Sequence, residues 1–473
     1  MVVGEFTESA DLVVIGGGPG GYVAAIRAAQ LGRQVTLVER EALGGVCLNV
    51  GCIPSKAVIS VADQLHRLQD AESRGIRVDG VGVDMAGVQG FKSQVVGKLT
   101  GGVKELLRGN GVTVVDAEAR FVDRHHVRVV SEYESKKIEF RQAILASGSR
   151  PRALDSLPID GQVVLGSTEL LALERVPRHL VVVGGGYIGL ELGTAFRKFG
   201  SAVTVVETLG HLLSGTDSGL VRHVARQLTQ LGVSVHLNTR VLSAEVRDGE
   251  AKLMLAGEQD QVEIVADAVL VTVGRIPNTD SLDLAEAGIA VDERGLVRVD
   301  ERLRTTNADV AAIGDITPGP MLAHKASYQG KIAAESLCGQ PSVQDALAVP
   351  AVIFTDPEIG TVGMTETQAR EAGYEPVTGR FSFQANGRAL SVGEARGEAL
   401  VVADKPSGQV LGVHIAGPEA SSLLAEGGLA LEMGATLEDL ALTIHAHPTL
   451  PETLMEAAEA ALGRPIHSMP RPR

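Results

Sequence analysis

Several features that mark common protein classes are missing from this sequence. It has no tryptophan and only three cysteines among 473 residues, too few for the disulfide framework of a small secreted protein. The N-terminus has no basic start followed by a long apolar run, so we expect no secretory signal. No stretch offers about eighteen uninterrupted apolar residues. We therefore expect no membrane span and a cytoplasmic location.

Positive charge is also scarce. Lys and Arg number 43 against 58 Asp and Glu, which gives a formal net charge of −15. A protein that binds nucleic acid through its phosphates needs basic patches, and the chain has no basic run. We therefore expect no nucleic-acid partner. The length corresponds to about three folded domains, at roughly 150 residues each.

One internal repeat organises the first half of the chain. Residues 13–39 and 181–207 align without a gap, and each has a β-branched run, a glycine-rich turn, a helix-period stretch and a second strand that ends in glutamate (Glu39, Glu207). This order is the βαβ fingerprint of a dinucleotide site. One such turn is a weak signal and could be an unrelated glycine turn, but two copies in register are a strong one. The turn glycines are Gly16, Gly18 and Gly21 in the first copy, and Gly184, Gly186 and Gly189 in the second.

Each residue of the fingerprint has a physical task. The first glycine makes the tight turn, the second lets a pyrophosphate approach the backbone, and the third allows the helix to contact the strand. The helix N-terminus faces the pyrophosphate, and the final glutamate accepts hydrogen bonds from ribose hydroxyls. The segment TLGHLL after Glu207 contains no arginine that could hold a 2′-phosphate. The second site is therefore predicted to bind NAD rather than NADP.

Two cysteines follow the first repeat in the motif GGVCLNVGCIPSK. Cys52 opens a predicted helix, whose N-terminal dipole would stabilise its thiolate, and Lys56 lies one turn further on the same face. This arrangement with Cys47 favours a redox-active pair. Half a zinc site or two buried thiols are the alternatives, but zinc needs two more soft ligands and only Cys338 remains. We expect no metal.

The motif HAHPTLPE near the C-terminus supplies a candidate base. His447 precedes a proline, and Glu452 lies five residues later at a predicted helix start. A carboxylate fixes the tautomer of a histidine, as a general base requires. On its own this pattern is more often structural than catalytic, but the cysteine pair favours catalysis. Elsewhere the patterns predict a helix over 95–108, strands within 112–145, a helix from Ala323, antiparallel strands after residue 350 and a helical tail over 419–461.

Over essentially its whole length the chain resembles the class I pyridine-nucleotide disulfide oxidoreductases. The resemblance rests on the two βαβ units and on motifs in family order, namely GGVCLNVGCIPSK, LASGS, VTVGRIPNT, AAIGDI with MLAH, and TIHAHPTLPE. It is greatest to members that oxidise dihydrolipoamide with NAD. It implies an α/β fold with two Rossmann-like domains, for FAD and NAD, and a C-terminal α+β dimerisation domain. The implied boundaries are 1–150 for FAD, 151–278 for NAD, 279–348 for a central segment that completes the FAD site, and 349–473 for dimerisation.

The resemblance also implies residue roles. Cys52 is the flavin-facing sulfur, able to form a thiolate–flavin charge-transfer complex, and Cys47 is the interchange sulfur that meets the substrate. His447, oriented by Glu452, acts as acid/base at the Cys47 site of the partner subunit in a homodimer. The implied FAD contacts are Gly16, Gly18, Gly21, Glu39, Lys56, Ala119, Ser147, Gly148, Asp315, Met321, Leu322, Ala323 and His324. The implied NAD contacts are Gly184, Gly186, Tyr187, Ile188, Gly189, Glu191, Glu207, Val241 and Gly274.

Some of these implied roles carry further detail. Lys56 and Glu191 would pair beside the flavin, and Tyr187 would either cover the empty nicotinamide site or only pack. Val46 and Ser147 stand where the family usually has threonine. Pro451 stands where serine or glycine is usual, which puts the geometry of the His447–Glu452 pair in question.

The implied partners are the lipoyl domain and the peripheral-subunit-binding segment of a 2-oxo-acid dehydrogenase acyltransferase core. We expect the acidic protein to meet a basic binding segment there. A purely structural subunit is the alternative, and its cysteine and histidine variants would be silent. Mercuric reductase is disfavoured because no cysteine follows Cys338, and the soluble transhydrogenases lack the cysteine pair.

Overall fold

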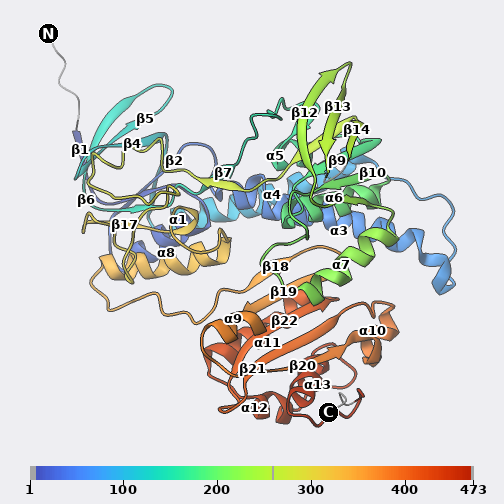
Figure 1. The fold of residues 1–473 in the computed structure, drawn as a ribbon. Helices are drawn as coiled ribbons and strands as arrows, with labels where there is room; N and C mark the ends of the chain where they lie inside the picture. Colours follow the sequence, from blue (N-terminus) through green and yellow to red (C-terminus); the bar gives the residue numbers. More distant parts are fainter. Residues whose placement is uncertain (1–6, 258–259, 470–473) are drawn as a thin grey trace.

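A computed structural model describes residues 7–257 and 260–469, so residues 1–6, part of the stretch in which we expect no secretory signal, lie outside it. The chain forms two α/β units and a C-terminal α+β unit, which lies below the other two in Figure 1. This arrangement confirms the predicted fold class.

The N-terminal unit is built on a seven-stranded sheet in the order β3-β2-β1-β6-β5-β4, with β17 paired in parallel to β6. Strands β1, β2, β3 and β6 are parallel, whereas β4 and β5 add an antiparallel hairpin. Because β17 comes from residues far along the chain, the segment after the second unit completes this sheet. The strands are β1 (Thr7–Ile15), β2 (Val35–Glu39), β3 (Thr113–Asp116), β4 (Glu118–Asp123), β5 (His126–Val130), β6 (Ser135–Leu145) and β17 (Val310–Ala312).

The helices of this unit cover the sheet and extend toward the second unit. Those helices are α1 (Pro19–Gln30), α2 (Gly45–Asn49), α3 (Cys52–Gln69), η1 (Ala71–Arg74), α4 (Met85–Gly109), η2 (Gly314–Ile316) and α8 (Ala323–Leu337). The long helices α3 and α4 run across the molecule from the first unit to the second (Figure 1). Helix α4 extends beyond the predicted 95–108, and α8 begins at the predicted residue.

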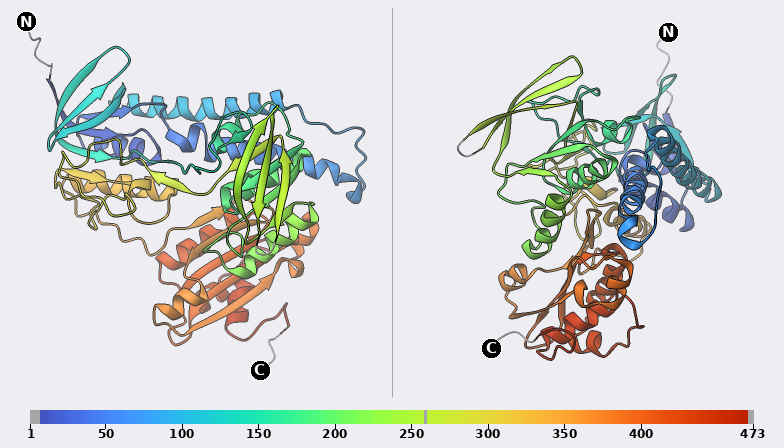
Figure 2. Two further views of the ribbon diagram at one scale, coloured as in Figure 1. Left: turned by 45° about the horizontal axis from the view of Figure 1, so that its top comes forward. Right: turned by 90° about the vertical axis from the view of Figure 1, so that its right-hand side faces the viewer.

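The second unit has a five-stranded parallel sheet in the order β11-β10-β9-β15-β8. A three-stranded antiparallel sheet, β12-β13-β14, projects from it (Figure 2), and β7 pairs with β16. Its elements are β7 (Ser149–Pro151), β8 (Val164–Leu165), α5 (Ser167–Leu171), β9 (His179–Val183), α6 (Tyr187–Phe199), β10 (Ala202–Val206), α7 (Ser218–Gln230), β11 (Ser234–His236), β12 (Arg240–Arg247), β13 (Glu250–Ala256), β14 (Gln261–Ala266), β15 (Ala268–Val271) and β16 (Arg275–Pro277).

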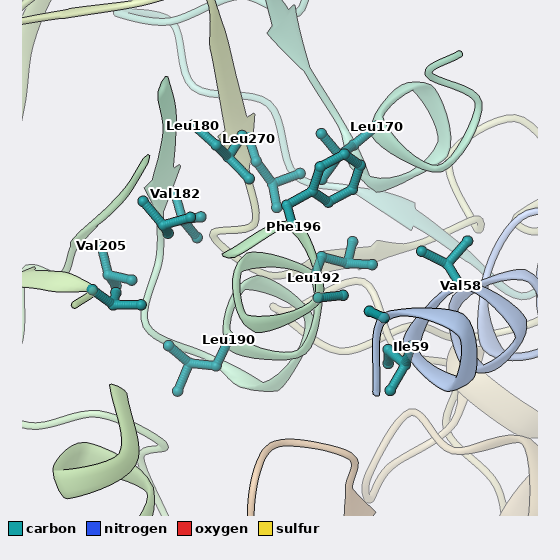
Figure 3. Packing of buried hydrophobic residues seen from close by; sticks show 14 of the residues in the cluster. Val58, Ile59, Leu170, Leu180, Val182, Leu190, Leu192, Phe196, Val205 and Leu270 are labelled. Atoms are coloured by element: carbon teal, nitrogen blue, oxygen red, sulfur yellow. The ribbon is translucent and has the colours of Figure 1, made fainter. Parts of the chain in front are cut away.

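Helix α6 packs against both its own sheet and helix α3. Figure 3 shows Val58 and Ile59 of α3 near Leu192 and Phe196 of α6, within one cluster of buried apolar side chains. The segment Gly45–Gln69, which includes α3, is long and apolar enough by composition to cross a membrane. Because α3 contributes side chains to this cluster, we interpret it as a core helix.

The C-terminal unit is a five-stranded antiparallel sheet in the order β18-β19-β22-β21-β20. Its elements are β18 (Ala351–Ile353), β19 (Glu358–Gly363), α9 (Glu366–Glu371), β20 (Pro376–Ser382), η3 (Phe383–Ala385), α10 (Gly387–Val392), β21 (Glu398–Asp404), β22 (Val410–Gly417), α11 (Ala420–Glu432), α12 (Leu437–Leu442) and α13 (Glu452–Ala461). The expectation of a helical tail over 419–461 is wrong in its middle. Residues 443–451, which carry HAHPT, are not helical, because Pro448 and Pro451 cannot continue a helix.

Candidate active site

Two adjoining cavities lie at the ends of the parallel strands of the first two units. The first, of about 470 Å³, is lined by the first glycine turn, both neighbouring cysteines and Asp315. The second, of about 940 Å³, is lined by the second glycine turn and Glu207. Tyr187 and Arg275 line both. Cavities of this size suit organic cofactors.

The two glycine turns have the geometry that the sequence predicts. Gly16 and Gly184 have φ values of +104° and +111°, which only glycine adopts readily. A Cβ on Gly21 would collide with the carbonyl oxygen of Gly16 at the base of α1, as one on Gly189 would with Gly184. A Cβ on Gly186 would instead meet no protein atom within 4 Å. The second glycine of the turn therefore leaves an open cradle of backbone that fits a pyrophosphate.

The glutamates that end the two βαβ units are held identically. The Gly17 N–H donates to Glu39 over 2.6 Å, and the Gly185 N–H donates to Glu207 over 2.6 Å. Both carboxylates line their cavities. The other oxygen of each accepts a backbone N–H two residues later, from Glu41 and from Leu209, over 2.8 Å, so both carboxylates are held in the same way at the edge of a cavity.

Cys47 and Cys52 lie together in the first cavity, as free thiols. Cys52 is the first residue of α3, as predicted, and Cys47 lies in α2. A hydrogen bond from the Cys47 thiol, helped by the charge of Lys56, lowers the pKa of Cys52 to about 7. The same hydrogen bond, together with burial, raises the pKa of Cys47. Of the two thiols, Cys52 is therefore the one that ionises first. Among the described residues no group of three or more His, Cys, Asp or Glu could hold a metal ion.

Lys56 forms the expected ion pair with Glu191, with 2.8 Å between Nζ and Oε2. Both line the first cavity, so Glu191 faces the cysteine side rather than the second cavity. The sequence gives no sign of Phe354, whose N–H donates to the other Glu191 oxygen over 2.9 Å and whose ring lies 4.4 Å from Lys56 Nζ. The pair is therefore fixed from the C-terminal unit.

Asp315 accepts a 2.5 Å hydrogen bond from the Ser149 hydroxyl, which itself accepts from Arg275 over 2.7 Å. The Ser147 hydroxyl donates to the Asn278 carbonyl over 2.7 Å. Arg275 and Asn278 line the first cavity but were not among the predicted site residues. Both belong to the motif VTVGRIPNT, which is the signal that could have identified them.

The predicted FAD contacts fall into two groups, according to whether they line the first cavity. Gly16, Gly18, Glu39, Lys56, Ser147, Gly148, Asp315, Met321 and Ala323 line the first cavity. Gly21, Ala119, Leu322 and His324 do not. The Ala119 side chain is buried in the core, and the residue pairs with Val129 across β4 and β5. Leu322 lines the second cavity, and His324 bonds the Pro350 carbonyl.

Most predicted NAD contacts surround the second cavity, namely Gly184, Gly186, Tyr187, Ile188, Glu207, Val241 and Gly274. Tyr187 is 39% exposed and stands between the two cavities, an arrangement that suits a gate and equally suits packing. Arg240 also lines this cavity. The prediction of NAD over NADP considered only the segment directly after Glu207 and did not include this arginine.

The predicted histidine–glutamate pair is present. Glu452 opens α13 and lies 2.9 Å from His447 Nδ1. Although burial opposes it, hydrogen bonds from the Thr449 N–H and from His447 lower the pKa of Glu452. The His447 side chain is 78% exposed and lines neither cavity of its own chain.

Comparisons with known proteins agree with this geometry. Residues 10–330 match the pyridine nucleotide-disulphide oxidoreductase family, and residues 349–458 match its dimerisation domain. The chain is 50% identical to a dihydrolipoyl dehydrogenase of Geobacillus stearothermophilus, over 99% of both chains, and 50% identical to one of Haloferax volcanii, over 100% of both.

Solved structures show the same relationship. LpdA from Mycobacterium tuberculosis matches with a TM-score of 0.89 at 27% identity, over 95% of this chain and 99% of that one. A flavoprotein disulfide reductase from Escherichia coli, RclA, matches with a TM-score of 0.84 at 29% identity, over 95% and 99%. Two glycine cradles, a cysteine pair between them and a separate dimerisation unit are thus the arrangement of an oxidoreductase, and the chain belongs to the pyridine nucleotide-disulphide oxidoreductase family.

Proposed function

We propose that this chain is a dihydrolipoyl dehydrogenase, which oxidises protein-bound dihydrolipoamide through a Cys47–Cys52 redox pair and FAD and reduces NAD to NADH. The observation that carries this proposal is the position of the two thiols, which share one cavity with the first glycine turn while a second dinucleotide cavity adjoins it. The full-length similarity to enzymes of that name supports it.

The residues present fit both cofactors. Gly18, Glu39, Gly148 and Asp315 would hold FAD in the first cavity, and a Cβ on Gly148 would meet no protein atom within 4 Å. Gly186, Glu207 and Val241 would hold NAD in the second. When bound, FAD would supply the redox chemistry that links the reduced dithiol to hydride transfer to NAD.

The cysteine pair performs the exchange with substrate. A dihydrolipoamide thiolate attacks Cys47 Sγ of the oxidised pair, the Cys47–Cys52 bond breaks, and Cys52 leaves as a thiolate. Its lowered pKa makes it a good leaving group. The second substrate thiolate then attacks the substrate sulfur of the mixed disulfide and expels Cys47. Lipoamide leaves oxidised by two electrons, and the cysteine pair holds them.

His447 is the base that takes the proton of the attacking thiol. Since Glu452 fixes its Nδ1, its Nε2 is left to act. Because His447 lines neither cavity of its own chain, the base at each dithiol site comes from a second copy. The enzyme is accordingly a homodimer.

The lipoyl arm comes from a larger assembly. A 2-oxo-acid dehydrogenase complex in the cytoplasm supplies the lipoyl domain, and the acidic dimer docks on a basic segment of its acyltransferase core. Binding that weakens as salt is added supports this electrostatic docking, whereas binding that persists unchanged in molar salt contradicts it.

The experiment that tests the function is an anaerobic titration of the purified holoenzyme with dihydrolipoamide. We expect a long-wavelength absorbance from the Cys52 thiolate beside the flavin, which disappears as added NAD becomes NADH. No band with dihydrolipoamide, but a band with NADPH, would contradict the substrate and keep the fold.

A further inference from the structure

Helices α3 and α6 are joined by two ion pairs of opposite polarity. Lys56 on α3 contacts Glu191 on α6 over 2.8 Å. Seven residues further along both helices, Asp63 on α3 contacts Lys198 on α6 over 2.7 Å. Seven residues are about two helical turns, so both pairs lie on the same two facing surfaces. The cation is on α3 in the first pair and on α6 in the second.

The apolar contact between these helices does not by itself fix their register. Val58 and Ile59 of α3 belong to one buried apolar cluster with Leu192 and Phe196 of α6 (Figure 3), and apolar contacts alone specify a register less strictly than polar ones do. The ion pairs oppose sliding of the two helices, because it would bring like charges together. A slip of two turns would bring Lys56 toward Lys198, or Asp63 toward Glu191. The two ion pairs therefore select one register, as buried polar groups do in coiled coils.

One segment of the C-terminal unit contacts both pairs. The Phe354 N–H donates to Glu191 over 2.9 Å, and two residues later Asp356 lies 2.8 Å from Lys198 Nζ. The Lys198 side chain is only 4% exposed and sits between two carboxylates. Burial opposes its charge, but Asp356 and Asp63 outweigh burial and raise the pKa of Lys198. The Lys198 ammonium, in the second unit, therefore forms ion pairs with the first unit through Asp63 and with the C-terminal unit through Asp356.

A second cation lies beside the cluster formed by Lys198, Asp63 and Asp356. Arg396 lies 3.9 Å from Asp356 and bonds Gln227, whose amide donates to Asp356 over 3.3 Å. Arg396 lies equally close to Glu394, at 3.9 Å, so Lys198 is the cation that directly bridges Asp63 and Asp356. Without Lys198, two carboxylates would face each other with one cation between the units, and α3 would lose its anchor on α6.

We propose that Lys198 is a positioning residue of the dithiol site, which fixes α3 in register against α6 and so keeps Lys56, one turn after Cys52 on α3, paired with Glu191. The inference rests on the proposed function, in which Lys56 and Cys52 belong to the reacting site. Lys198 does not line either cavity and acts through the two helices. Its effect must therefore appear as a change in the reactivity of Cys52.

The test measures alkylation of Cys52 by iodoacetamide in the holoenzyme, in a Cys47→Ser background where Cys52 is the one thiol of the pair. The rate is followed on the Cys52 peptide by mass spectrometry from about pH 5 to about pH 9, with the Cys338 peptide as internal reference. We expect Lys198→Met to shift the profile upward by about one pH unit, so that alkylation on its acid side is about tenfold slower. Lys198→Arg should restore the profile. The matched control is Lys136→Met, which removes a partly buried lysine that pairs with the single carboxylate of Glu8 and lines neither cavity.

A double-mutant cycle separates positioning from general loosening. If Lys198 acts through Lys56, Lys198→Met should change nothing further in a Lys56→Met background. The same shift in both backgrounds, or no shift at all, overturns the inference. Should Lys198→Met not fold, Asp63→Asn, which removes a partly exposed partner, carries the same cycle. If the unmutated holoenzyme shows no thiolate–flavin band when titrated with dihydrolipoamide, the proposed function is at fault instead.

Discussion

His447 Nδ1 lies 2.9 Å from Glu452 Oε1, and the other oxygen of the same carboxylate accepts from the Thr449 N–H over 2.8 Å. Glu452 is the first residue of α13, and Pro451 precedes it with helical dihedral angles. The unusual proline is thus compatible with the pair, because it occupies the start of a helix, where its missing N–H costs no hydrogen bond.

This geometry predicts that Glu452→Gln slows dihydrolipoamide oxidation by about 10²-fold. Glutamine keeps the size of the side chain but cannot stabilise the imidazolium that forms when His447 takes a proton. Reduction of ferricyanide by NADH needs no thiol base, so it should be unchanged, and stopped-flow kinetics with both substrates would show the difference. An equal loss of both activities would indicate damage to the fold instead.

The matching glutamates of the two βαβ units allow a paired prediction. Glu207→Ala should lower kcat/KM for NAD by about tenfold or more, because a charge-assisted hydrogen bond is lost. The preference over NADP should fall further, since Arg240 lines the same cavity and could then meet a 2′-phosphate. Glu39→Ala is the control, and it should weaken FAD retention while leaving the NAD/NADP ratio unchanged. A ratio that moves in Glu39→Ala but not in Glu207→Ala would reverse the assignment of the two sites.

Sequence signals predicted those parts of the site whose geometry is local. The glycine turns, Cys52 at the start of α3 and Glu452 at the start of α13 each follow from a few neighbouring residues. Phe354 and Asp356 were missed because they meet α6 more than 150 residues away in sequence. Such contacts depend on how whole units pack, which no short window of sequence contains.

Strand β19 is an example in the fold where a short stretch of sequence does not determine the structure. Its sequence EIGTVG holds two glycines, which weaken strand propensity, yet it pairs with β18 and β22. Gly360 also lies directly against the backbone of α11, where a side chain would not fit. Tertiary packing therefore decides the structure of this segment against its local preference.

A buried lysine predicts an unusual pH dependence of stability. Lys325 donates to the carbonyl oxygens of Gly314 and Thr317, and burial lowers its pKa from 10.5 to about 8, despite nearby Asp315. Since the folded pKa lies below the unfolded one, the unfolded chain binds more protons between these values, and stability from this group rises with pH across that window. The full change is about 3 kcal/mol.

We therefore expect the difference in unfolding free energy between the parent protein and Lys325→Met to move in favour of the parent as the pH rises from about 8 to 10.5. Urea denaturation across this range measures it. A difference that stays constant, or moves toward the variant, would show that the ammonium is not destabilised by burial.

The last prediction concerns the source of the base. Since His447 lines neither cavity of its own chain, the proposed mechanism takes the histidine of each dithiol site from another copy. Cys47→Ser and His447→Gln homodimers should both be inactive with dihydrolipoamide. Co-refolding them in equal amounts makes half of the dimers mixed, and each mixed dimer has one site with an intact Cys47 and an intact His447. The mixture should recover about a quarter of parental activity, because half the dimers carry one working site of two. Recovery near zero would mean that the cysteine and histidine of one site come from the same chain, since then every site in the mixture would carry one defect.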